Sequence, residues 1–107
     1  MKKELELYEI LYLVKPNFTE HELENKVEFY RNFLLQKGSQ VMVQIRGKRS
    51  LSYNIKGYET ANYIQMIYVG NQSLIKSLET EIQRDESVLR HLTNRLSELP
   101  NILEMSP

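Results

Sequence analysis

The chain has 107 residues, of which 41% are hydrophobic and 26% charged, and its formal net charge is zero. A length of this order predicts one domain with a single modest core. The chain has no cysteine and no apolar run near the ~20 residues of a membrane span, so its composition excludes disulfides, Cys-ligated metals and a spanning helix.

The first predicted element is a strand over residues 5–14, which Lys15, Pro16 and Asn17 end. Thr19 and Glu22 then match a capping box, in which each side chain accepts a hydrogen bond from the other residue's backbone N–H. This pattern predicts a helix that begins after Thr19 and ends before Gly38. Its apolar face recurs at helical spacing and consists of Leu23, Val27, Tyr30 and Leu34.

The hydrophobic period changes to two over residues 41–55, which predicts a strand. The alternation keeps its phase across Gly47, so we expect one long strand that bends near this glycine. A strand over residues 58–69 follows, then a helix capped by Asn71 or Ser73, and then a strand over residues 88–96. The apolar members of the long strand are Val41, Val43, Ile45, Leu51, Tyr53 and Ile55.

This β-α-β-β-α-β order predicts the ferredoxin-like α+β fold, a four-stranded antiparallel sheet with two helices on one face. We expect residues 1–97 to form the domain and residues 98–107 a short tail. In this fold the first and third strands are central. Their helix-covered face is predicted to hold Tyr8, Ile10, Tyr12, Val14, Ile64, Met66 and Tyr68. Their open face is a candidate contact surface, predicted to hold Leu7, Glu9, Leu11, Leu13, Tyr63, Gln65 and Ile67.

Charge is distributed unevenly along the chain. Residues 4–28 contain seven carboxylates, whereas residues 29–58 contain six cations and no carboxylate. Lys48 and Arg49 follow Gly47 in this basic part, where they are placed to contact phosphates. The alternative is an ordinary solvated bend, whose cations protect a strand edge from aggregation.

No catalytic motif emerges. His21 and His91 have no recognisable motif around them, and the acidic residues near Glu20 are typical of a helix N-terminus. Neither a phosphate-binding glycine loop nor metal-ligand spacing is present. We therefore expect no catalytic residue, metal, cofactor or small-molecule substrate. The strand around Tyr63 also lacks the aromatic signature of RNA-recognition motifs, which argues against base stacking on Tyr63.

Four motifs nevertheless match one known family in order along residues 8–96. They are Tyr8-Glu9-Ile10 with Lys15-Pro16-Asn17, the stretch GKRSLSYNI at residues 47–55, Ala61-Asn62-Tyr63, and DESVLRH at residues 85–91. The stretch at residues 47–55 matches the family signature Gly-Arg/Lys-Arg-x-Leu-Ala-Tyr-Pro-Ile without a gap, except that Ser52 and Asn54 replace its alanine and proline. On these motifs the chain resembles the bacterial-type small-subunit ribosomal protein six family.

The resemblance implies a ferredoxin-like fold, no enzymatic activity and assembly into the small ribosomal subunit. It also implies binding to small-subunit (16S-type) ribosomal RNA, jointly with small-subunit ribosomal protein eighteen. Lys48 and Arg49 carry over as RNA-binding candidates, to which we add Arg46 and Arg90. The open sheet face is the candidate surface for the partner protein, through Leu11, Leu13, Tyr63, Gln65 and Ile67.

The sequence also indicates the cellular location in which we expect this function. The chain has a single alanine but many residues with AT-rich codons, namely Ile, Asn, Lys and Tyr. Its N-terminus resembles neither a signal peptide nor a transit peptide. We expect a ribosome in a plastid or a bacterial cytoplasm, with the plastid preferred, and no membrane partner. The alternative to a ribosomal role is a ferredoxin-like interaction module that dimerises through its open sheet face, and an enzyme ranks third.

Overall fold

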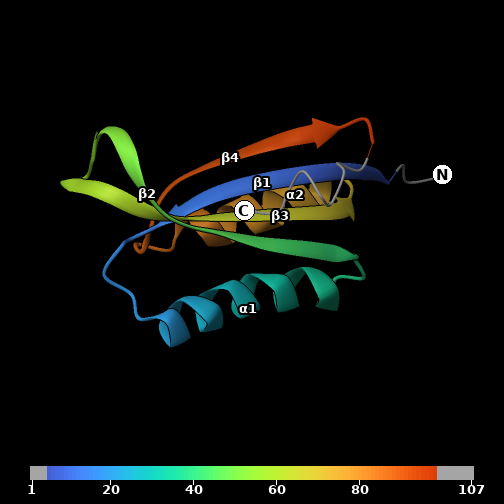
Figure 1. Ribbon diagram of the computed structural model, residues 1–107. Coiled ribbons are helices and arrows are strands. Elements are labelled where there is room, and N and C mark those ends of the chain that lie inside the picture. Colours follow the sequence, from blue (N-terminus) through green and yellow to red (C-terminus); the bar gives the residue numbers. More distant parts are fainter. Residues whose placement is uncertain (1–4, 99–107) are drawn as a thin grey trace.

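The computed structural model in Figure 1 describes residues 5–98. Its elements follow one another as β1 (Glu6–Val14), α1 (Glu20–Gln36), β2 (Val41–Ile55), β3 (Tyr58–Gly70), α2 (Gln72–Gln83) and β4 (Val88–Leu96). The strands pair antiparallel in the order β2-β3-β1-β4. The predicted ferredoxin-like fold is therefore confirmed. The division between domain and tail stays a prediction, since residues 99–107 lie outside the described range.

Both helices begin at the residues that the local sequence specifies. The Thr19 N–H donates to Glu22 Oε1 at 2.9 Å, and the Glu22 N–H donates to Thr19 Oγ1 at 3.1 Å, which is the predicted capping box. Of the two caps considered for α2, Asn71 is the one used, because its side chain accepts from the Leu74 N–H at 2.9 Å. Neither helix is long and apolar enough to cross a membrane.

The main core lies between the helices and one face of the sheet. The apolar stripe predicted for α1 is buried there, and the Tyr12 and Tyr30 rings meet edge to face with centroids 5.6 Å apart. All residues predicted for the helix-covered face of β1 and β3 are buried, at 4% exposure or less. Alternation along the central strands therefore assigned their two faces correctly.

Strand β2 is one element, as expected, but it does not keep one face to the core. Ile45 pairs with Ile64 and Gly47 pairs with Tyr63, so Arg46 is the additional residue of a β-bulge, and Gly47 has a φ of 95°. One added residue exchanges the faces of all residues that follow it. The odd-numbered apolar residues of β2 therefore lie on the helix-covered face before Gly47 and on the open face after it.

The far end of the β2–β3 hairpin forms a second, smaller core on the open face. In this cluster Leu13, Ala61 and Leu89 are buried. Leu51 and Ile55 pack against them from beyond the bulge. Figure 1 shows this part of β2 rising above the sheet at the end opposite the chain's N-terminus. The hairpin therefore covers one end of the open face and leaves a contact surface over the remainder.

Candidate nucleic-acid interface

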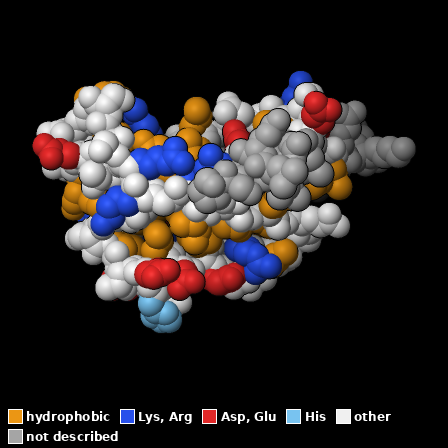
Figure 2. Space-filling model, in the orientation of Figure 1, with side chains coloured by type: hydrophobic (Ala, Val, Ile, Leu, Met, Phe, Trp, Pro, Cys, Tyr) orange, Lys and Arg blue, Asp and Glu red, His pale blue; other side chains and the backbone are white. Residues whose placement is uncertain are grey.

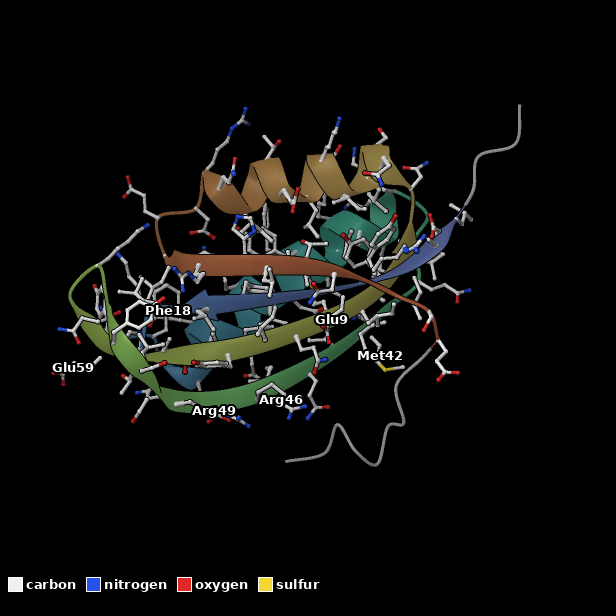
Figure 3. All side chains as sticks on the ribbon, turned by 90° about the horizontal axis from the view of Figure 1, so that it is seen from above. Glu9, Phe18, Met42, Arg46, Arg49 and Glu59 are labelled. Atoms are coloured by element: carbon white, nitrogen blue, oxygen red, sulfur yellow. The ribbon has the colours of Figure 1, made fainter. Side chains whose placement is uncertain are left out.

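A hollow of about 300 Å³ lies on the open face, lined by Glu9, Leu11, Arg46, Arg49, Tyr63 and Gln65. We call it the basin. Figure 3 looks onto this face and labels Arg46 and Arg49 on β2 and Glu9 on β1. Residues three apart in a regular strand point to opposite faces. The bulge at Gly47 is what brings both arginines to the basin.

The two arginines are positioned by polar and aromatic neighbours. Arg46 Nη1 donates to Gln65 Oε1 at 3.4 Å, and Gln65 Nε2 donates in turn to Glu9 Oε2. The Arg49 guanidinium lies 5.8 Å from the centre of the Tyr63 ring. A cation over a ring keeps its full charge, so the Arg49 contact orients the guanidinium without neutralising it. The basin holds two arginines against the single carboxylate of Glu9, and this local excess of positive charge suits an anionic group such as a phosphate.

The four RNA-binding candidates do not form one patch. Lys48 pairs with Asn62 and is exposed on the face opposite to Arg49, because neighbours along a strand alternate. Arg90 lies on β4, where its Nη1 donates to the Tyr53 hydroxyl at 2.6 Å. Arg46 and Arg49 share the basin, whereas Lys48 and Arg90 stand at separate places around the hairpin.

The expected partner-protein face is less exposed than its sequence indicated. Leu11, Tyr63 and Gln65 are half-buried, but Leu13 retains only 7% exposure and Ile67 only 2%. Leu13 belongs to the second core. Both side chains therefore pack beneath the surface of this face and are not exposed on it.

Sequence reasoning missed Leu92, whose side chain is 57% exposed. It pairs with Leu11, so it lies on the open face beside the basin. The only local signal was the apolar residue between polar neighbours in β4. The pairing register, which the sequence alone does not supply, is what places Leu92 on this face.

Charge is distributed unevenly over the surface. Figure 2 shows a row of carboxylates along the edge where Figure 1 places α1, with Lys and Arg gathered above it towards the sheet. The exposed acids of α1 are Glu20, Glu22, Glu24 and Glu28. A chain of zero net charge thus has locally basic surface on the side of the sheet. Within residues 5–98 no group of three or more His, Asp or Glu side chains is arranged to hold a metal ion.

The fold and the basin define a class: small ferredoxin-like α+β proteins with an open, partly basic sheet face. Comparison with known proteins identifies the family within this class. The family model described as Ribosomal protein S6 matches residues 7–95, and the chain belongs to this family. Proteins of this family are structural components of the small ribosomal subunit, which is built on ribosomal RNA, and they are not enzymes.

The relatives include plastid and cyanobacterial proteins. The small ribosomal subunit protein bS6c of Guillardia theta is 43% identical over 93 residues, covering 86% of this chain and 97% of the relative. Protein bS6 of Picosynechococcus is 36% identical over 98 residues, covering 91% and 85%. These relatives support a ribosome of a plastid or of a bacterial cytoplasm as the location.

A solved structure shares the fold. The 30S ribosomal protein S6 of Thermotoga maritima superposes with a TM-score of 0.81 at 23% identity, covering 87% of this chain and 89% of that one. The four-stranded sheet with its two helices is therefore the family's architecture.

Proposed function

We propose that this small-subunit protein binds small-subunit ribosomal RNA together with small-subunit ribosomal protein eighteen. The observation that carries the proposal is the bulge at Gly47, which sets Arg46 and Arg49 side by side on the open face. Guanidinium groups bind phosphates with defined geometry, and each contact releases condensed counterions from the RNA.

The same face offers apolar area for a protein partner. Leu92 and Leu11 lie next to each other across β4 and β1, beside the basin. Protein interfaces combine an apolar centre with a polar or charged rim, and arginine is frequent in both settings. We assign Leu11 and Leu92 to the partner protein. Arg46 and Arg49 beside them and Arg90 on β4 are RNA contacts, and Lys48 contacts the RNA from the opposite face.

The charge balance explains why two proteins act together. With a net charge of zero, this chain attracts RNA only through its locally basic surface. A basic companion protein supplies the remaining attraction and orients the basin towards the RNA. We therefore expect weak RNA binding by the protein alone and tight binding by the pair.

The test is a binding titration with a small-subunit ribosomal RNA fragment, with and without protein eighteen. We expect the pair to bind at least tenfold more tightly than either protein alone. The competing role, a homodimer joined through the open face, predicts a dimer in sedimentation equilibrium and no gain in RNA affinity from protein eighteen. That pair of results would overturn the proposal.

A further inference from the structure

Tyr53 is an exposed aromatic residue on the raised end of the β2–β3 hairpin. Its side chain is 58% exposed. The segment that carries it leaves the ladder with β3, because pairing stops at Ser50 with Thr60 and resumes at Ile55 with Tyr58. Tyr53 thus belongs neither to the regular sheet nor to the buried part of the second core.

Arg90 fixes the position of this ring from its hydroxyl end. Its Nη1 donates to the Tyr53 hydroxyl at 2.6 Å, while the guanidinium carbon is 5.7 Å from the ring centre. The short hydrogen bond places the guanidinium beyond the hydroxyl and not over the middle of the ring. The aromatic ring is therefore held in place without being covered by the cation that holds it.

A fixed and uncovered aromatic ring suits an unpaired nucleobase. Proteins read single-stranded RNA by stacking splayed bases on aromatic side chains. A ring that is already ordered loses little conformational freedom on binding. Arg90 has further N–H donors for a neighbouring phosphate, and Lys48, Arg49 and Lys56 lie along the same hairpin.

We propose that Tyr53 is a stacking platform for one unpaired base of the RNA, with Arg90 holding the ring and contacting the adjacent phosphate. This inference rests on the proposed function, in which RNA is the ligand. Tyr63 is a poorer platform, because it is half-buried and packs against the second core.

The first measurement uses fluorescence, since the chain contains no tryptophan. The Tyr53→Trp variant and a control, Phe29→Trp, introduce indoles at sites of 58% and 57% exposure on the hairpin and on α1. Each is mixed with protein eighteen and then with the RNA fragment, with the wild-type complex as background. We expect RNA to quench the emission of Tyr53→Trp and to leave that of Phe29→Trp unchanged.

The second measurement is affinity as a function of salt. Tyr53→Leu removes the ring without removing a charge, so we expect about 5- to 150-fold weaker RNA binding with an unchanged log-affinity versus log-salt slope. Tyr53→Phe keeps the ring and should retain most of the affinity. Circular dichroism melts confirm that each variant is folded.

Two results would overturn the platform while leaving the proposed function intact. One is wild-type RNA affinity in Tyr53→Leu. The other is a change in Tyr53→Trp emission on addition of protein eighteen alone, which would place Tyr53 in the protein interface. Failure of the wild-type pair to bind the RNA fragment would overturn both the platform and the proposed function.

Discussion

At the scale of single residues, the Asp85 carboxylate joins α1 to the turn before β4. Its Oδ2 accepts from Lys26 Nζ at 2.8 Å and from the Tyr30 hydroxyl at 2.6 Å, while Oδ1 accepts from the N–H and hydroxyl of Ser87. Burial alone raises the pKa of Asp85, but the hydrogen bonds from Lys26, Ser87 and Tyr30 outweigh it and lower the pKa to about 2. The charged form is therefore part of the folded structure.

This pKa predicts an acid-sensitive contribution to stability. Because the folded pKa of about 2 is below the ordinary value of 3.8, the contribution is complete above pH 3.8 and disappears as the pH falls towards 2. We expect Asp85→Asn to lower the free energy of unfolding by about 2 kcal/mol at neutral pH. Urea titrations across the acid range should show this difference shrinking. Glu28→Gln, which removes an exposed ion pair with Arg31, is the control and should change little.

Arg49 and Lys48 allow a further prediction at this scale. We expect Arg49→Ala to weaken RNA binding by the two-protein complex and to reduce the log-affinity versus log-salt slope by about 1. Both side chains are exposed, so each change should alter stability by less than about 0.5 kcal/mol. The affinity and salt slope of Lys48→Ala, a substitution on the opposite face, are measured for comparison. An Arg49→Ala variant with the wild-type slope would return Arg49 to the role of a solvated surface cation.

At the scale of elements, the sequence predicted those features that depend on local chemistry. The Thr19 capping box and the bounds of β2 were confirmed because neighbouring residues determine them. The exchange of faces within β2 was not predictable, since a straight strand and a bulged one show the same alternation. The burial of Leu13 likewise results from the hairpin that folds over it. Such features arise from pairing between strands, for which Gly47 was the only local signal.

The prediction at the scale of elements concerns Gly47. Its φ of 95° is unfavourable for a residue with a Cβ, although an added Cβ would meet no atom within 4 Å. We expect Gly47→Ala to reduce the free energy of unfolding by about 1–2 kcal/mol through backbone strain alone. Gly47→Asn should be milder, because Asn tolerates this conformation. Denaturant midpoints that are equal for Ala and wild type would show that the bulge does not require a glycine.

At the scale of the whole molecule, exposed acids gather on α1, while Arg46, Arg49 and the apolar contact area lie on the open sheet face. The exposed apolar residues include Leu92 near the basin and Phe29 on α1, with almost equal exposure of 57% each. They lie on different sides of the molecule. Comparing the same substitution at both positions therefore separates an effect on partner binding from the general effect of changing an exposed apolar residue.

We expect Leu92→Asp to leave the protein folded and to weaken binding of protein eighteen by about 1–2 kcal/mol. Phe29→Asp should leave this binding unchanged. Ile67→Asp, by contrast, should destabilise the fold, because this side chain is only 2% exposed and a carboxylate there would be buried. Calorimetric titrations and thermal melts measure both quantities. Equal loss of binding in Leu92→Asp and Phe29→Asp would contradict the assignment of the open face to the partner.

The strand nearest the N-terminus lies in the middle of the sheet, and this governs when the protein can fold during its own synthesis. Leu7 pairs with Val69 on one side and with Leu96 on the other. Contacts so distant along the chain form slowly, since a long loop must close before any of them is gained. When β1 and α1 leave the ribosome, neither neighbour of β1 has yet been made. The sheet closes only after β4 has emerged, so β1 stays without both of its neighbours until all six elements have left the ribosome.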